Sequence, residues 1–327
     1  MRDKWNRDSA ILQFDKPQLN ALIAPAFPTS KVKAFVQAEG GLANTNIRLD
    51  LDNQAEPILL RLFVRDSKQA RKEWQINKLV HSTVPSPEFF YFSPENQFSG
   101  HPYILMEWIE GLRMEEVIAK LNADEVVRLG ESVGSTLASI HNFNFSAAGF
   151  FDSDLNINEP IDVGSAGLLS YANDCLIDGI GAERLGAELT RRLLDFLTAE
   201  ACLLDQWKGA PCLSHSDFGG SNILIKETSD GWKVSAVLDW EFAFSATPFF
   251  DFGNLLRAPH GTITGFEEAV ARGYQPDGAK LPMEWRKMSL LTDLTAWLDF
   301  MTRKDPGANL IADAQRVISQ TIDNWKN

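Results

Sequence analysis

The stretch LSHSDFGGSNILI, residues 213–225, carries the densest set of candidate functional side chains in the sequence. It places His215, Asp217 and Asn222 in the order H-x-D-x-x-x-x-N, in a glycine-containing turn that precedes the apolar run NILI. A second apolar run, VSAVLDWEF, follows and carries Asp239 near its end. Polar residues at turns that border short apolar strands add little to a core, and such turns are where catalytic residues often lie.

These residue types match the needs of phosphoryl transfer. That reaction uses a carboxylate to orient the attacking hydroxyl and accept its proton, and oxygen ligands to hold Mg²⁺. Asp217 suits the first task, and Asn222 and Asp239 suit the second because Mg²⁺ prefers carboxylate and amide oxygens. A hairpin return through WKVSAVL would bring Asp239 back beside the loop. We expect His215 to hydrogen-bond locally and to hold the shape of the loop.

The flanking sequence predicts an α+β protein with a boundary near residues 107–112. Apolar and polar residues alternate through 31–65, which predicts strands, and the spacing changes to that of a helix at 66–80. Another strand is expected at 100–108, after which the chain is mostly helical except for the β segments around 212–240. Residues 1–30 are expected to be a polar lead-in ending in the turn APAFPTS. We therefore expect a small β-rich domain at 1–107 and a larger helical domain at 108–327.

Composition narrows the class of protein. No apolar run is long enough to span a bilayer, and the start MRDKWNRDSA lacks the apolar stretch of a signal peptide, so we expect a cytoplasmic protein that is not bound to membrane. The three cysteines show no metal-ligand spacing. The net charge of −13 disfavours nucleic-acid binding, which needs a basic surface. It is compatible with a cationic substrate, and equally with a role in solubility alone.

The loop at 213–225 and the sequence Asp239-Trp240-Glu241 resemble the catalytic region of the aminoglycoside phosphotransferase and choline kinase-like family, relatives of the protein kinases. By the order of expected elements, the resemblance covers roughly residues 30–260. It implies a two-lobed protein-kinase-like fold, with a small β-rich lobe and a larger, mostly helical lobe. It also implies ATP as the phosphate donor, Mg²⁺ as the metal, and a hydroxyl group on a small molecule as the acceptor.

The resemblance assigns further residues to the nucleotide. Arg61 stands where the family usually has a Lys, or often an Arg, that reaches the ATP phosphates, and Glu73 would pair with it. The alternative is an ordinary surface pair between a strand and a helix. Gly41, Asn44 and Thr45 lie in GGLANTN, where the family has its phosphate-covering loop. That segment is not GxGxxG, and an ordinary hairpin turn explains it about as well.

Further positions follow from the resemblance. In LMEWIEG, residues 105–111, the carbonyl of Glu107 and the N–H of Ile109 would contact adenine. Asp251, in PFFDFGNL, comes too late for the magnesium motif of protein kinases and would brace the catalytic loop from the start of a helix. Glu241 is either a second acid at the metal or a rim residue that meets the substrate.

The identity of the acceptor stays open, as do the oligomeric state and the choice between a resistance role and a metabolic role. Aminoglycosides and amino alcohols are within the family's range, and Asp293 and Asp299 either line a cationic pocket or lie on helix surfaces. The alternative from another class is a non-catalytic nucleotide-binding protein on the same fold, which would not need all three of Asp217, Asn222 and Asp239. Protein kinase activity is disfavoured because the chain has neither a GxGxxG loop nor an APE-type segment.

Overall fold

The computed structural model describes residues 11–38, 44–275 and 281–325, and the chain divides into two compact units. The first unit contains Met1–Glu116 with two later segments, Phe151–Asn156 and Ser221–Glu241. The second contains Val117–Phe150, Ile157–Gly220 and Phe242–Asn327. The single domain boundary at residue 107 stays a prediction, and Gly41 lies outside the described residues.

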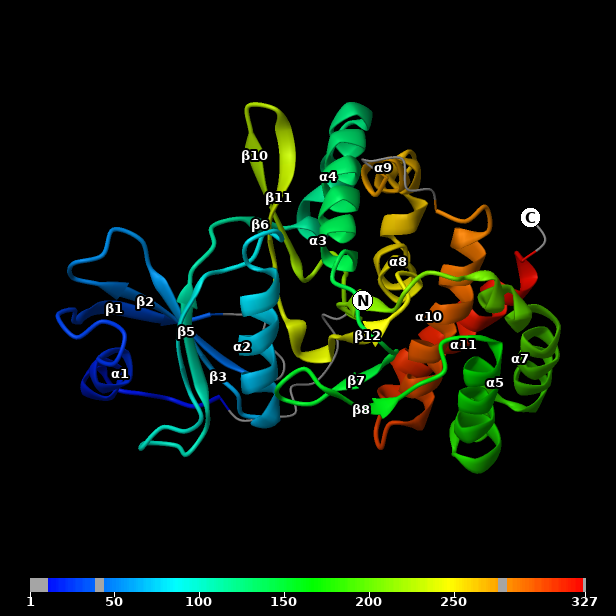
Figure 1. The fold of residues 1–327 in the computed structure, drawn as a ribbon, viewed down its shortest axis with the longest axis horizontal. Coiled ribbons are helices and arrows are strands. Elements are labelled where there is room, and N and C mark those ends of the chain that lie inside the picture. The colour runs from blue at the N-terminus through cyan, green and yellow to red at the C-terminus, as the bar shows by residue number, and fades with distance from the viewer. Residues whose placement is uncertain (1–10, 39–43, 276–280, 326–327) are drawn as a thin grey trace. The chain divides into compact units, whose positions relative to one another are not determined.

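An antiparallel sheet forms the body of the first unit, in the strand order β1-β2-β3-β5-β4 (Figure 1). The expected alternation is clear in the strand that starts at Thr45, where every second residue is buried. The register places Arg61 opposite Ile104 on one side and opposite Asn46 on the other. The strands are β1 (Val32–Gln37), β2 (Thr45–Leu51), β3 (Ile58–Leu62), β4 (Phe89–Ser93) and β5 (Tyr103–Glu107).

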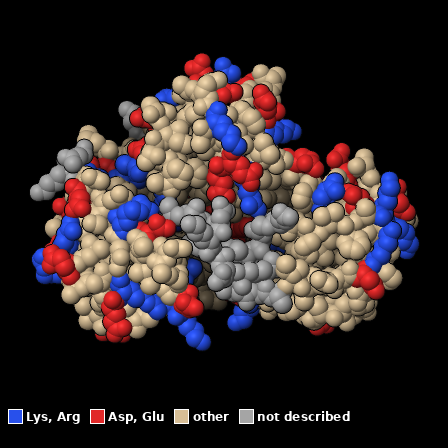
Figure 2. Space-filling view, turned by 180° about the vertical axis from the view of Figure 1, so that it is seen from behind, with Lys and Arg blue, Asp and Glu red and all other residues tan. Residues whose placement is uncertain are grey.

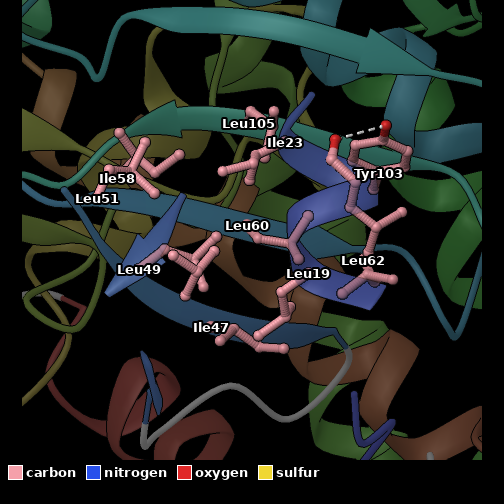
Figure 3. Packing of buried hydrophobic residues seen from close by; sticks show 12 residues of the cluster. Leu19, Ile23, Ile47, Leu49, Leu51, Ile58, Leu60, Leu62, Tyr103 and Leu105 are labelled. Atoms are coloured by element: carbon pink, nitrogen blue, oxygen red, sulfur yellow. Dashed lines mark hydrogen bonds between the residues drawn. The ribbon is translucent and has the colours of Figure 1, made fainter. Parts of the chain in front are cut away.

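Helix α1 (Lys16–Ile23) corrects the expectation of a polar lead-in through residue 30. Asp15 caps it in a capping box with Gln18, which is a strong start signal, and its apolar side is fully buried. Figure 3 shows Leu19 and Ile23 of this helix among the side chains of one sheet face, including Leu60. The hydroxyl of Tyr103 donates a hydrogen bond of 3.0 Å to the Leu22 carbonyl and ties α1 to the sheet.

Helix α2 (Lys68–Val80) covers the opposite face of the same sheet. Ala70 of the helix packs with Phe63, Ile104 and Met106, which alternate in the sheet with residues of the α1 side. The carboxylate of Asp66 accepts a 3.0 Å hydrogen bond from the Lys68 N–H and satisfies one of the free donors at the start of the helix. The expected helix at 66–80 is therefore present.

A second, smaller sheet of the first unit carries residues from the later part of the chain. Strands β10 (Ile223–Thr228) and β11 (Gly231–Val237) form a hairpin, and β10 also pairs with β6 (Leu112–Arg113) (Figure 1). Asn222 directly precedes this hairpin and Asp239 follows it. Helix α3 (Met114–Val117) then leads into the second unit.

The second unit is mainly helical and contains a four-stranded sheet in the order β8-β7-β12-β9. Among its helices, α4 packs against α9, and α10 packs against both α8 and α11. Strand β9 ends at Ser214, so the loop that carries His215 and Asp217 begins at the edge of the sheet. The strands are β7 (Gly149–Phe151), β8 (Ile157–Pro160), β9 (Cys212–Ser214) and β12 (Phe244–Ala246); the helices are α4 (Ala123–His141), α5 (Ser165–Asn173), α6 (Gly181–Leu185), α7 (Ala187–Glu200), α8 (Phe249–Leu255), α9 (Phe266–Gly273), α10 (Trp285–Thr302) and α11 (Gly307–Asp323), with shorter turns η2 (Ile118–Lys120), η3 (Asp174–Asp178), η4 (Ala201–Gln206), η5 (Trp240–Phe242) and η6 (His260–Thr262).

The described helices include none that combines the length and the apolar character needed to cross a bilayer. On the face drawn in Figure 2, acidic and basic side chains are intermixed.

Candidate active site

Arg61 occupies the middle of a buried ionic network in the first unit. Strand alternation turns its side chain away from Leu60 and Leu62, toward the face that α2 covers. Its Nη2 lies 3.3 Å from Glu73 Oε1, and its Nη1 lies 2.5 Å from Asp239 Oδ1. The side chains of Arg61 and Glu73 are only 8% and 1% exposed, so the expected pairing is present and the surface-pair alternative is wrong.

The charges in this network perturb one another. Burial alone would lower the pKa of Arg61, but Asp239, Glu73 and Glu241 hold it above its usual range, so Arg61 is a permanent cation. Burial raises the pKa of Glu73 to about 8, although the Arg61 guanidinium opposes that rise. Arg61 also has a second carboxylate partner, Asp239, whose side chain is 43% exposed.

Two further cations hold the Asp239–Glu241 segment. The Lys72 ammonium, on the buried side of α2, donates to the Glu241 carbonyl oxygen at 2.5 Å. Arg65 Nη2 lies 2.9 Å from Glu241 Oε1. Glu241 was expected to be a metal acid or a rim residue, and the structure gives it an ion pair with Arg65. Lys72 is a site residue that was not predicted from the sequence, although its position beside Glu73 on the same helix was a usable signal.

Asn222 and Asp239 carry the side-chain types that Mg²⁺ prefers, and their backbones are neighbours. The Leu238 N–H donates to the Asn222 carbonyl at 2.9 Å, and Ile223 pairs with Val237, so the two positions are neighbours at the open end of one hairpin. Among the described residues no group of three or more His, Cys, Asp or Glu could hold a metal. A single carboxylate and an amide suit Mg²⁺, which usually completes its shell with phosphate oxygens and waters.

The remaining nucleotide-side residues lie at strand ends of the first unit. Glu107 ends β5, and its N–H donates to the Glu88 carbonyl at 2.8 Å. Ile109 lies two residues further along, and within the described residues no protein group accepts a hydrogen bond from the Ile109 N–H. Thr45 begins β2, and its hydroxyl accepts a 3.2 Å bond from the Leu12 N–H, while Asn44 is buried just before it. Their contacts with nucleotide stay predictions.

The second unit contains the loop with His215 and Asp217, and Asp251 holds this loop. Asp251 lies in the first turn of α8, fully buried, and accepts from the His215 N–H at 2.8 Å and from the Ser216 N–H at 2.7 Å, one on each carboxylate oxygen. His215 Nδ1 accepts in turn from the Asp217 N–H at 3.2 Å. The expected bracing role of Asp251 and the expected local hydrogen bond of His215 are both confirmed.

Ser216 has a φ of 66°, an unusual left-handed conformation for a residue with a side chain. The two bonds from Asp251 flank this residue and hold it there. Asp217, the next residue, is partly exposed. A partly accessible carboxylate on a rigidly held loop can orient a hydroxyl group and accept its proton.

Asp293 does not line a cationic pocket. Arg257 Nε donates to both of its oxygens, at 2.9 and 3.1 Å, and the Trp297 indole donates to one of them at 2.8 Å. Asp293 is only 8% exposed, so it is a buried structural carboxylate. Both expectations for it, a pocket lining and a helix surface, are therefore wrong. Asp299 forms a pair with Arg303 at the surface, with side-chain exposures of 48% and 43%.

Comparisons with known proteins identify the family and the fold of the chain. A search of curated protein sequences finds no significant match. The family model of the phosphotransferase enzyme family matches residues 34–290, more than half of the chain. The chain therefore belongs to the phosphotransferase enzyme family.

Solved structures show the same fold at low sequence identity. Wild-type aminoglycoside 2'-phosphotransferase-IIIa in complex with GDP has a TM-score of 0.70 at 15% identity, over 95% of this chain and 99% of that one. A thermostable variant of aminoglycoside phosphotransferase APH(4)-Ia, in ternary complex with ADP and hygromycin B, gives 0.67 at 16% identity, over 95% and 99%. The GDP and kanamycin complex of APH(2")-IIIa gives 0.68 at 15%, over 94% and 98%. The fold is thus the two-lobed kinase-like fold, as expected.

Proposed function

We propose that this protein is a kinase that transfers the γ-phosphate of ATP to a hydroxyl group of a small molecule. The observation that carries the proposal is the position of the strained backbone. Among the described residues, the non-glycine residues with positive φ are Leu155, Ser216 and Asp239. Ser216 directly precedes the candidate base Asp217, and Asp239 is itself a candidate metal ligand. Strain of this kind persists where the surroundings enforce it, and it concentrates at functional sites.

Each candidate residue then has a role. Asp217 aligns the acceptor hydroxyl with the γ-phosphate and accepts its proton, and His215 keeps the loop in shape. Arg61, directed by Glu73, binds the phosphates. Asn222 and Asp239 would hold Mg²⁺, which when bound neutralises charge on the phosphates.

The rest of the nucleotide is bound by backbone groups. We assign adenine to the Glu107 carbonyl and the Ile109 N–H, and phosphate contacts to Gly41, Asn44 and Thr45. Nucleotide binding is assigned to residues 1–107, with the metal ligands added from the hairpin, and acceptor binding to the helical residues of 108–327. Most of the catalytic effect is then positioning and electrostatic stabilisation.

Amino sugars and amino alcohols are the first acceptors to test. The structural neighbours that were solved with kanamycin and hygromycin B support amino sugars, and the net charge of −13 is compatible with a cationic acceptor. The structure offers no support for Asp293 as a contact to such a cation, because Arg257 already neutralises it.

The test is a phosphate-transfer screen with MgATP labelled at the γ-phosphate, over amino sugars, amino alcohols and neutral sugars. We expect labelled phosphate on at least one acceptor class, and slow hydrolysis of ATP in the absence of acceptor. Binding of MgATP with neither transfer nor hydrolysis would favour the alternative, a non-catalytic nucleotide-binding protein. A parallel screen with MgGTP decides the preferred donor.

A further inference from the structure

Asp251, which braces the catalytic loop, also takes part in a chain of hydrogen bonds with His141 and Tyr274. His141, the last residue of α4, places Nε2 3.0 Å from Asp251 Oδ2. The other ring nitrogen, Nδ1, lies 2.9 Å from the Tyr274 hydroxyl, at the end of α9. The His141 and Asp251 side chains are only 3% and 0% exposed, so water competes little for these bonds. The order is Tyr274, His141, Asp251 and then the backbone of His215 and Ser216.

The direction of each hydrogen bond follows from the donors and acceptors. The Asp251 carboxylate accepts from the two backbone N–H groups, so it needs a donor from His141, and Nε2 must carry the proton. Nδ1 of a neutral imidazole is then an acceptor, and the Tyr274 hydroxyl can donate to it. Burial raises the pKa of Tyr274, which keeps that hydroxyl protonated. The hydroxyl of Tyr274 therefore selects the tautomer of His141 that Asp251 requires.

Close packing of α4 and α9 brings the two side chains together. A Cβ added at Gly134 of α4 would lie 2.1 Å from the Val270 carbonyl oxygen, and one added at Gly273 would lie 2.1 Å from the Glu131 carbonyl oxygen. Only glycine permits backbones to approach this closely. The Tyr274 ring also packs edge-on against His141, with centroids 5.5 Å apart, which fixes the hydroxyl at the imidazole.

We propose that His141 and Tyr274 are positioning residues for the catalytic loop, acting through Asp251 on the backbone that sets the direction of the Asp217 carboxylate. The inference rests on the proposed function for its kinetic part only. Neither residue touches substrate in this scheme. Removing either side chain should reduce turnover. The binding of nucleotide, which is assigned to residues of the first unit, should stay unchanged.

The test compares Tyr274→Phe with Tyr103→Phe. Each variant deletes one tyrosine hydroxyl that makes one hydrogen bond, to His141 Nδ1 at 2.9 Å or to the Leu22 carbonyl at 3.0 Å. We expect Tyr274→Phe to lower kcat about tenfold with an unchanged KM for ATP, because a small misplacement of a catalytic group is costly. Tyr103→Phe should keep kcat within twofold. Equal kcat values in the two variants would overturn the proposal.

Two readouts are independent of activity. Amide hydrogen exchange in peptides that cover residues 213–220 should be faster in Tyr274→Phe and unchanged in Tyr103→Phe. The ¹⁵N spectrum of the His141 ring should show the Nε2–H tautomer in the wild type and a mixture of tautomers in Tyr274→Phe. Unchanged exchange and an unchanged tautomer would contradict the proposal, even if the wild-type protein transferred no phosphate. Absence of transfer by the wild type would instead count against the proposed function alone.

Variants of His141 give a second route. In His141→Gln the side-chain amide can still donate from near the Nε2 position, whereas His141→Leu has a similar bulk and no donor. We expect the Gln variant to recover most of the turnover and of the loop protection that the Leu variant loses. Equal losses in both would indicate that only the packing of His141 matters, which would refute the hydrogen-bonded chain.

Discussion

Replacing Asp251 by Asn tests the bracing of the catalytic loop by a single charged group. The wild-type carboxylate accepts three hydrogen bonds, from His215 N–H, Ser216 N–H and His141 Nε2. An amide of the same shape has one acceptor oxygen. The amide keeps more hydrogen bonds when its oxygen takes the place of Oδ2, where it accepts from the His215 N–H and from His141 Nε2. The NH₂ group then faces the Ser216 N–H, which loses its acceptor.

The cost follows from this geometry. Hydrogen bonds to a charged group contribute about 1.5–3 kcal/mol each, and at least one is lost while the other two become neutral. Two N–H groups are also left facing each other in a buried place. We expect Asp251→Asn to lower the free energy of unfolding by about 2–4 kcal/mol. We also expect kcat to fall more than about tenfold, because Ser216 loses a bond that holds its left-handed backbone.

Urea titrations followed by both circular dichroism and tryptophan fluorescence measure the stability, since agreement of the probes checks two-state behaviour. Asp205→Asn is the matched control: its carboxylate accepts from the Ser165 N–H and hydroxyl in the same unit, and it is exposed. We expect that variant to lose less than about 1 kcal/mol and to keep its turnover. An Asp251→Asn protein as stable and as active as this control would refute the bracing role.

Three other predictions concern the first unit and the packing of the second. Burial raises the pKa of Glu73 to about 8, so the folded protein binds the carboxyl proton more tightly than the unfolded chain does. The free energy of unfolding should therefore fall by up to about 1.4 kcal/mol per pH unit as the pH rises from about 5 to 8. Glu73→Gln should remove this pH dependence in thermal melts, and an unchanged dependence would refute the raised pKa of Glu73. Gly134→Ala should lower the free energy of unfolding by about 1–3 kcal/mol in urea titrations, because the new methyl meets the Val270 carbonyl; a stabilised variant would contradict the close approach. Arg71→Ala deletes an exposed ion pair with Asp154 and should change the free energy of unfolding in urea titrations by less than about 0.5 kcal/mol. A larger loss would contradict the interpretation of this pair as a surface contact.

Local patterns in the sequence were sufficient for the parts of the site that lie near each other along the chain. The spacing of His215, Asp217 and Asn222 identified the loop, because such a turn between short strands is a local feature. The pairing of Arg61 with Glu73 came from the resemblance to the family, and the structure shows that a strand and the following helix bring the two residues together. The resemblance to a known family then supplied the role of Asp251.

Contacts between distant segments could not be predicted in the same way. His141 and Tyr274 are 133 residues apart, and no local pattern relates the end of one helix to the end of another. Asp293 was expected in a pocket or on a surface, because sequence alone does not show that Arg257 and Trp297 bind it. Helix α1 was missed for a different reason: the prolines at 25 and 28 suggested a turn and obscured the start signal at Asp15.

The most direct test of the proposed chemistry is the variant Asp217→Asn, assayed with MgATP and the best acceptor from the screen. The amide keeps the shape of the side chain but is a poor acceptor of the proton from the hydroxyl. We predict that phosphate transfer falls at least about a thousandfold while the affinity for MgATP, measured by calorimetry, stays within about twofold of the wild type. Turnover near the wild-type value in this variant would contradict the assignment of Asp217 as the catalytic carboxylate.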